Sequence, residues 1–310
     1  EGITMAGQLA IRWIERDVNS YLNDLLKTKN VTYVVASDTD SIYVKLGGLV
    51  DKIFKDKSDT RKIVKVLDKF CEEKLQGAID KSFDRLAKYV NAFEQKMIMK
   101  REVIANKGIW TAKKRYILNV YNEEGVDLKE PKLKIMGIEA VKTSTPLPCR
   151  DKLKESFKIL MNGDEKEMKE FCVNFRREFE LLPPEDIGFP RSVNNVEKYS
   201  DTTSIYKKGT PMHVKGALLY NHLLKTKKVS HKHQAIYEGD KGKFVHLRKN
   251  PWNANVITFI GSLPKEFDMH KLIDYEQQFT KSFMDPLRFI LEAINWKVDA
   301  SDSNTIEDFF

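Results

Sequence analysis

The sequence predicts an α+β fold: antiparallel hairpins packed with helices, followed by a mostly helical region with a small β-hairpin. Three features predict it. Residues 31–44 have the pattern of two strands joined by a tight turn, and residues 3–26 and 60–93 carry apolar side chains at helical spacing. Beyond Pro146 helical patterns dominate, which places a domain boundary near that residue.

Length and composition predict a folded protein with a sizeable core. The 310 residues suffice for one large or two ordinary domains, and 41% of them are hydrophobic. No apolar run has the length of a membrane span, and no signal peptide is visible at the start. Cys71, Cys149 and Cys172 lie far apart, so we expect reduced residues and neither disulfides nor a zinc site. A net charge of +8 is compatible with a polyanionic partner.

Two carboxylates stand at the predicted turn of residues 31–44. Residues 31–37 are rich in β-branched and aromatic residues, and the next four, Asp-Thr-Asp-Ser, favour turns. Because side chains two apart in a strand share a face, Asp38 and Asp40 can converge on one point. Such a pair suits Mg²⁺, and two ions can clamp both oxygens of a phosphoryl transfer. An ordinary surface turn is the alternative interpretation.

Helices are predicted on both sides of this hairpin. Residues 3–26 carry apolar side chains at spacings of three and four, and Gly7 inside this pattern suggests close packing against another element. A second apolar stripe runs through residues 60–93. The chain begins at Glu1 without a methionine, which is typical of a fragment or a processed piece.

A block with sheet character follows. We expect strands at residues 97–104 and 108–121 with a turn at residues 105–108 between them. The second predicted strand contains three adjacent cations and an aromatic residue, Lys113, Lys114, Arg115 and Tyr116. Cations beside an aromatic ring are what contacts to phosphates or base edges require.

The region after Pro146 reads as helices interrupted by loops. Two helices are predicted within residues 149–180, others begin near Met212 and Leu272, and a hairpin is predicted around residues 238–242. The acidic tail, residues 299–310, ends in an apolar residue followed by two aromatics, Ile306, Phe309 and Phe310. This spacing fits one helical turn that fills a pocket of a partner, although the tail could equally fold back on its own domain.

Several separated motifs resemble one family. Asp38–Ser41 after a hydrophobic strand resembles the third palm motif of family B DNA polymerases, and Lys113–Tyr116 is similar to that family's Lys-Lys-Arg-Tyr primer–template motif. Further segments are similar to the replicative polymerases of T4-like bacteriophages: residues 93–102, 132–139, 142–146, 213–216, 274–275 and the terminal Phe-Phe. The ordered combination covers nearly the whole chain.

The resemblance implies a palm-type antiparallel sheet and a thumb. Residues 1–146 would be the C-terminal part of the palm, residues 147–298 a duplex-binding thumb, and residues 299–310 a clamp-binding tail. The exonuclease domain, the fingers motif and the first palm aspartate of the family are missing from this sequence. The chain departs from the family pattern at Ser37, in place of a glycine, and at Lys215, in place of an arginine.

The resemblance also implies a function. It is that of the C-terminal portion of a replicative DNA-directed DNA polymerase, which adds deoxynucleotides to a primer 3′ end once joined to the N-terminal part. Asp38 and Asp40 would be catalytic ligands of two Mg²⁺ ions shared with the missing palm aspartate. Residues implied to contact DNA are Lys113, Lys114, Arg115, Tyr116, Lys134, Lys142, His213 and Lys215. Residues implied to bind a sliding clamp are Ile306, Phe309 and Phe310.

The implied partners are primer–template DNA, deoxynucleoside triphosphates, the N-terminal polymerase part and the clamp, without a membrane. The implied location is the cytoplasm, that of the infected host if the source is a phage. Two alternatives stay open. One is a non-catalytic DNA- and clamp-binding protein derived from a polymerase; the other is a glycosyltransferase that uses Asp38 and Asp40 with a nucleotide-sugar.

Overall fold

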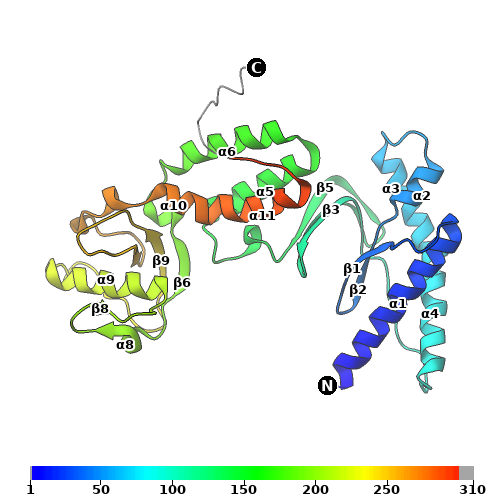
Figure 1. Cartoon of the computed structure of the whole chain (residues 1–310), viewed down its shortest axis with the longest axis horizontal. Helices are drawn as coiled ribbons and strands as arrows, with labels where there is room; N and C mark the ends of the chain where they lie inside the picture. The colour runs from blue at the N-terminus through cyan, green and yellow to red at the C-terminus, as the bar shows by residue number, and fades with distance from the viewer. Residues whose placement is uncertain (1, 300–310) are drawn as a thin grey trace. The chain divides into compact units, whose positions relative to one another are not determined.

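The structure is a computed structural model that describes residues 2–299. The chain divides into two compact units, Glu1–Lys134 and Ile135–Phe310. Both combine helices with antiparallel strands, as Figure 1 shows, and this confirms the predicted α+β class. The division falls before Pro146, and the assignment of palm, thumb and tail to residues 1–146, 147–298 and 299–310 stays a prediction. Within the described part, no helix has the length and apolar character that crossing a membrane requires.

Two long helical segments lie in unit 1, as predicted. α1 spans Gly2–Leu26 and buries a stripe along one face. The second segment is continuous from residue 60 to residue 89, four residues short of the prediction. It consists of α3 (Thr60–Phe70), a π-helical turn (Cys71–Leu75) and α4 (Gln76–Tyr89), and the short helix α2 (Gly47–Ile53) precedes it. The two segments are joined by the Trp13 Nε1 hydrogen bond to the carbonyl oxygen of Ser82, at 3.2 Å.

The predicted hairpin in residues 31–44 is confirmed. Its strands are β1 (Val34–Asp38) and β2 (Ser41–Val44), and Asp38 pairs with Ser41 across a two-residue turn. Because β1 ends at Asp38, the same-face argument for the two aspartates does not extend to Asp40, which lies in the turn.

The next hairpin differs from the prediction. β3 (Val103–Ala112) runs through the expected turn at residues 105–108, and the chain reverses at Lys113 and Lys114 before β4 (Arg115–Glu123). Residues 97–102 form no strand. Gly108 serves close packing instead of a turn, because a Cβ there would lie 2.6 Å from the Trp110 ring. Lys114 adopts a left-handed backbone conformation, with φ of 59°, which a turn requires and the sequence did not signal.

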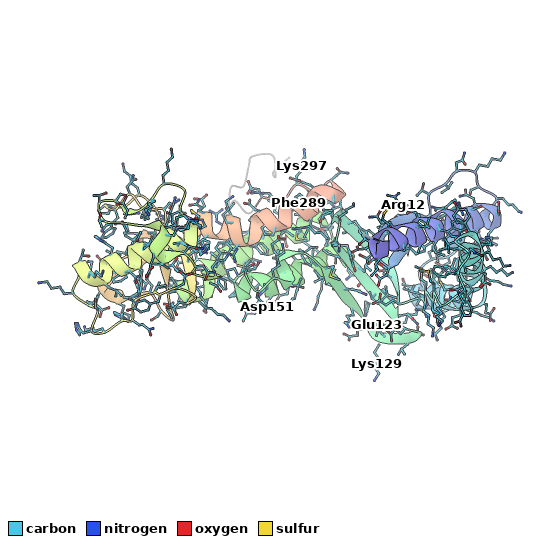
Figure 2. All side chains as sticks on the ribbon, turned by 90° about the horizontal axis from the view of Figure 1, so that it is seen from below. Arg12, Glu123, Lys129, Asp151, Phe289 and Lys297 are labelled. Carbon is cyan, nitrogen blue, oxygen red and sulfur yellow. The ribbon has the colours of Figure 1, made fainter. Side chains whose placement is uncertain are left out.

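A third strand completes this sheet, in the order β3-β4-β5. β5 spans Val126–Met136 and follows a tight turn, where Glu124 and Gly125 both have positive φ, 50° and 86°. Such a pair matches the type I′ hairpin turn. Figure 2 shows the labelled side chains of Glu123 and Lys129 at the end of the β4–β5 hairpin.

Unit 2 has a helical core rich in phenylalanine. The two helices predicted within residues 149–180 are confirmed, since α5 spans Leu147–Asn162 and α6 spans Glu165–Phe179. The rings of Phe175 and Phe283 lie 4.8 Å apart. The helix predicted to begin near Leu272 is confirmed as a continuous segment of α10 (Tyr275–Phe279), a π-helical turn (Thr280–Met284), α11 (Asp285–Leu291) and a 3-10 turn (Glu292–Ile294).

Two small sheets and α9 (Met212–Thr226) complete unit 2. The first sheet has the order β10-β9-β6, so the predicted hairpin around residues 238–242 is wrong: β9 pairs with β6 and β10 and not with the residues just before it. The remaining elements are α7 (Pro184–Ile187), β6 (Phe189–Ser192), α8 (Val196–Tyr199), β7 (Ser200–Asp201), β8 (Ile205–Tyr206), β9 (Lys241–His246), β10 (Val256–Phe259) and 3-10 turns at Glu139–Val141, Lys265–Phe267 and His270–Leu272.

Candidate metal and nucleic-acid site

The turns of two hairpins meet in unit 1. Asp38 ends β1, Lys114 lies in the β3–β4 turn, and Lys114 Nζ lies 3.5 Å from Asp38 Oδ1. Thr39 Oγ1 also donates to Asp38 Oδ1, at 3.0 Å. The hydrogen bond from Thr39 and the ammonium of Lys114 hold the pKa of Asp38 below its usual value. The carboxylate motif and the lysine-rich motif, far apart in the sequence, therefore lie beside each other in the folded chain.

An aromatic cluster joins the β1–β2 hairpin to the β3–β4 hairpin through side chains of their strands. The Tyr43 hydroxyl donates to the Tyr116 hydroxyl at 2.8 Å, and the Trp110 ring centroid lies 5.4 Å from that of Tyr43. Tyr116 is only 5% exposed. Burial and the bond from Tyr43 raise the pKa of Tyr116. The structure thus gives Tyr116 a part in holding the hairpins together, and a direct DNA contact by this residue stays a prediction.

The other cations of this motif differ in their placement. Lys113 and Lys114 are exposed in the turn, so the expectation of cations inside a strand is wrong for these two. Arg115 is the first residue of β4 and is half-buried. Lys134, near the end of β5, forms an ion pair with Glu102, at 2.7 Å between Nζ and Oε1.

Asp38 and Asp40 are carboxylates of the kind that Mg²⁺ accepts as ligands, and their joint binding of a metal stays a prediction. Mg²⁺ is commonly held by one or two carboxylates together with substrate phosphates and water. In residues 2–299 no cluster of three or more His, Cys, Asp or Glu side chains could hold a metal. The carboxylates of the turn could therefore supply a share of the ligands, and the remainder would come from substrate or from another polypeptide.

A second group of predicted DNA contacts lies in unit 2. Arg191 donates to the backbone carbonyls of Ser144 and Pro190, at 3.0 and 2.8 Å. Burial and the nearby charge of Arg191 lower the pKa of His213, so we expect a neutral imidazole near neutral pH. Lys215 Nζ lies 5.6 Å from the centroid of the Tyr206 ring. His213 and Lys215 both lie in the first turn of α9, and the charge of Arg191 acts on His213.

Lys142 differs from that group. Its Nζ lies 2.9 Å from Glu139 Oε1, three residues earlier in the chain. A phosphate would have to compete with this carboxylate, and the predicted contact of Lys142 with DNA stays a prediction. The predicted clamp contacts, Ile306, Phe309 and Phe310, lie outside the described residues.

Sequence reasoning missed the residues that support these sites. Tyr43 and Trp110 pack on Tyr116, and Arg191 lowers the pKa of His213. Trp110 precedes the lysine-rich motif and could have been suspected as a packing partner of its tyrosine. Arg191 carries no local signal, because its relation to His213 arises only in the folded chain.

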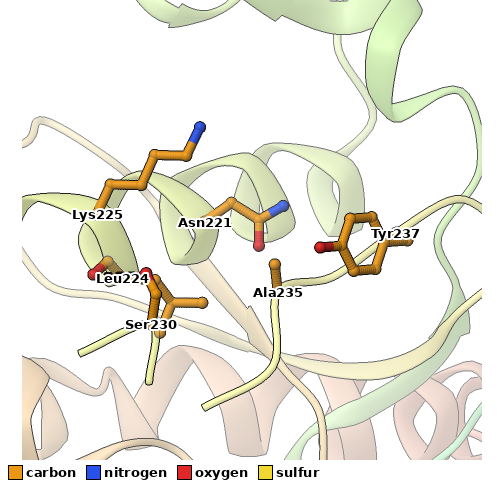
Figure 3. A pocket seen from close by; sticks show the side chains of 6 residues that line it. All are labelled: Asn221, Leu224, Lys225, Ser230, Ala235 and Tyr237. Atoms are coloured by element: carbon orange, nitrogen blue, oxygen red, sulfur yellow. Dashed lines mark hydrogen bonds between the residues drawn. The ribbon is translucent and has the colours of Figure 1, made fainter. Parts of the chain in front are cut away.

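A small hollow beside α9 is lined by none of the residues that were predicted to bind metal or DNA. Its volume is about 180 Å³, and it is lined by Asn221, Leu224, Lys225, Ser230, Ala235 and Tyr237 (Figure 3). Asn221 Nδ2 donates a hydrogen bond to the backbone carbonyl of Ile236, at 2.8 Å. The backbone N–H of Ile236 donates to Asn221 Oδ1, also at 2.8 Å. With these groups already satisfied, Asn221 has a structural role.

Comparison with known proteins places this chain beside DNA polymerases of bacteriophages. It is 37% identical over 323 residues to the DNA-directed DNA polymerase of Escherichia phage RB69, a match that covers 99% of the chain and 35% of the relative. It is 34% identical over 308 residues to that of Enterobacteria phage T4, covering 94% of the chain and 33% of the relative. No protein-family model matches. The resemblance to polymerases of T4-like phages is thereby confirmed, and the chain spans about a third of these relatives' length.

Proposed function

We propose that this chain is the C-terminal portion of a replicative family B DNA polymerase that adds deoxynucleotides to a primer 3′ end together with an N-terminal part. The observation that carries the proposal is the meeting of Asp38 with Lys114, because it joins the two polymerase-like motifs at one place. The similarity to two phage polymerases over nearly the whole chain supports it.

In this proposal Asp38 and Asp40 hold this chain's share of two Mg²⁺ ions, with the first palm aspartate on the N-terminal part. When bound, the ions would stabilise the charge that develops during phosphoryl transfer. Lys114 lies beside the Asp38 carboxylate in the described structure, and it would turn toward DNA once a metal takes its place there. Lys113 and Arg115, the neighbours of Lys114 in the chain, would also hold the primer–template.

Contacts farther along the duplex come from unit 2 in this proposal. Lys215 and Arg191 would bind backbone phosphates, and a neutral His213 would act through hydrogen bonds. Lys134 and Lys142 would bind phosphates only by exchanging the carboxylate partners that hold them. The C-terminal tail would dock on a sliding clamp through Ile306, Phe309 and Phe310. Only the sequence motif supports this part of the proposal.

Primer extension with Mg²⁺ and deoxynucleotides tests the function. The full chain is assayed alone and with the N-terminal part of the phage RB69 polymerase, and each assay includes an Asp40→Ala variant. We expect extension only in the mixture, and its loss with Asp40→Ala. No extension by a mixture that demonstrably associates would contradict the catalytic role and leave the non-catalytic DNA- and clamp-binding alternative. Extension by the chain alone would mean that it holds a complete metal site.

A further inference from the structure

A single amide of α1 holds the start of β1. Asn19 lies on α1, and its Oδ1 accepts hydrogen bonds from the backbone N–H groups of Tyr33 and Val34, at 2.7 and 2.9 Å. Val34 is the first residue of β1, and α1 and β1 pack side by side, as Figure 1 shows. Because two consecutive backbone groups share one side-chain oxygen, Asn19 fixes both the position and the direction in which the chain enters the strand.

Asn23, one helical turn after Asn19, extends this attachment to the loop before β1. Its Nδ2 donates to the carbonyl oxygens of Asn19 and Val31, both at 2.8 Å. Its Oδ1 accepts from the N–H of Val31 at 3.0 Å and from the hydroxyl of Thr28 at 2.9 Å. Both hydrogens and both lone pairs of this amide are therefore used. Asn19 and Asn23, called the amide clamp below, together tie the loop and the start of β1 to α1.

The pairing of β1 with β2 is irregular at the base of the hairpin, where the amide clamp holds it. The register shifts between Val34 and Ala36, which interrupts the regular ladder just after the clamped residues. Before this irregularity, the Lys45 N–H donates to the Tyr33 carbonyl at 2.8 Å. Asp38 ends the strand that Val34 begins. Because an extended strand cannot lengthen, a displacement at its start reaches the carboxylate at its end.

We propose that Asn19 is a positioning residue for primer extension, which places the Asp38 carboxylate by holding the other end of its strand. The inference rests on the proposed function. Among the described residues, the hydrogen bonds of the Asn19 side chain reach neither Asp38 nor its partners Thr39 and Lys114. Mg²⁺ demands nearly ideal octahedral geometry, and a misplacement of about 1 Å can cost about a hundredfold in rate. The effect of Asn19 therefore runs through the placement of one carboxylate.

The chemistry of the two amides predicts opposite responses to the same substitution. Within residues 2–299 the Asn19 side chain is bonded only through its oxygen. Asn19→Asp keeps an oxygen of the same size in the same place, and a carboxylate accepts both N–H groups. Asn19→Leu keeps the volume and leaves the N–H groups of Tyr33 and Val34 without this acceptor. Asn23→Asp, in contrast, places a carboxylate against two carbonyl oxygens to which it cannot donate.

Amide hydrogen exchange in the full chain tests the amide clamp without any measurement of activity. We expect the Tyr33 and Val34 amides, followed by NMR, to exchange at least about tenfold faster in Asn19→Leu than in wild type. Asn19→Asp should keep the wild-type rates because it keeps the acceptor. Ser82→Ala is the matched control and should also keep them. It removes a different hydrogen bond between α4 and α1, from Ser82 Oγ to Asp17 Oδ2 at 2.5 Å.

Primer extension with the N-terminal part of the phage RB69 polymerase tests the positioning role. The rate is measured against Mg²⁺ concentration, at a temperature at which circular dichroism finds every variant folded. We expect Asn19→Leu to need at least about tenfold more Mg²⁺ for half-maximal extension and to lose about a hundredfold in maximal rate. Asn19→Asp and Ser82→Ala should resemble wild type in both quantities, and Asn23→Asp should resemble Asn19→Leu.

The results that would overturn this inference differ from those that would overturn the proposed function. Wild-type exchange rates in Asn19→Leu, equal impairment of Asn19→Asp and Asn19→Leu, or extension by Asn19→Leu that matches Ser82→Ala would each overturn the inference. In these cases wild type still extends primers, and the proposed function stands. A wild-type mixture that associates but does not extend primers would contradict the proposed function and the positioning role with it, whatever the exchange rates show of the amide clamp.

Discussion

Two groups of cations in this chain are candidates for DNA contact, and they differ in what holds them. In unit 1, Lys114 lies 3.5 Å from a carboxylate oxygen of Asp38. In unit 2, Arg191 donates to two backbone carbonyls, and Lys215 lies over the ring of Tyr206. The first arrangement places the lysine beside an opposite charge, whereas the second orients the cations through groups that carry no negative charge.

This difference predicts distinct roles. We expect the group in unit 2 to bind backbone phosphates without a metal, because its cations stay available to anions. We expect the group in unit 1 to bind DNA well only when a divalent cation relieves Lys114 of its bond to Asp38.

The largest effect concerns the aromatic cluster under the site in unit 1. Tyr116→Ala removes a buried ring and should lower the free energy of unfolding by about 3–5 kcal/mol. Tyr116→Phe removes only the hydrogen bond from Tyr43 and should cost about 1 kcal/mol. Denaturant titration of both variants measures these values. Nearly wild-type stability of Tyr116→Ala would mean that Tyr116 does not hold the hairpins together.

Gly216→Ala tests how α9 positions the group in unit 2. A Cβ at Gly216 would lie 2.5 Å from the backbone nitrogen of Thr258 on β10, so α9 must shift. We expect a loss of about 1–3 kcal/mol in stability and weaker DNA binding, because His213 and Lys215 move with the helix. Gly77→Ala on α4 is the control, since a Cβ there meets nothing within 4 Å. If both substitutions affect stability and DNA affinity alike, the close approach of α9 to β10 is not what positions the group.

A smaller effect is expected for Lys215→Ala in duplex binding without a divalent metal. Loss of one phosphate contact should reduce the slope of the logarithm of affinity against that of salt concentration by about 1. Lys225→Ala, an exposed lysine near the end of the same helix, should leave the slope unchanged. Fluorescence anisotropy at several salt concentrations measures both, and identical slopes for the two variants would remove Lys215 from the interface.

The smallest effect is a pH dependence that comes from His213. Its pKa is lowered in the folded chain by burial and by Arg191, while the unfolded chain takes up the proton near its ordinary pKa. The unfolded state therefore binds more protons as the pH falls, and stability present above about pH 6.5 is lost on acidification. Between about pH 7.5 and about pH 5.5, wild type should lose more stability than His213→Gln in denaturant titrations. Equal losses would show that His213 is not the group responsible.

The elements that sequence reasoning located correctly have strong local patterns. The hairpin in residues 31–44 combines a β-branched run with four turn formers, and the helices have long apolar stripes. The turn in the next hairpin was misplaced because Gly108 resembles a turn residue, whereas in the structure it makes room for Trp110. The actual turn at Lys113 and Lys114 contains neither glycine nor asparagine, so no local signal marked it.

The composition of the site was predictable, but its connections were not. Asp38, Asp40 and Lys114 stand out in the sequence as carboxylates and a lysine in short motifs. Their relation depends on how one hairpin packs on another, which is decided by buried contacts such as that of Tyr43 with Tyr116. Neither tyrosine carries a signal in the sequence that names the other as its partner.

A metal-exchange experiment tests most directly whether Asp40 is a metal ligand. Asp40→Cys replaces a hard carboxylate with a softer thiolate, which binds Mg²⁺ poorly and accepts softer cations more readily. Primer extension by Asp40→Cys with the N-terminal part of the phage RB69 polymerase is measured in Mg²⁺ and in Mn²⁺, with Asp40→Ala beside it. We predict that Mn²⁺ restores extension to Asp40→Cys and not to Asp40→Ala. Extension by Asp40→Ala in Mg²⁺ at the wild-type rate, or no restoration of Asp40→Cys by Mn²⁺, would contradict a metal-binding role of this residue.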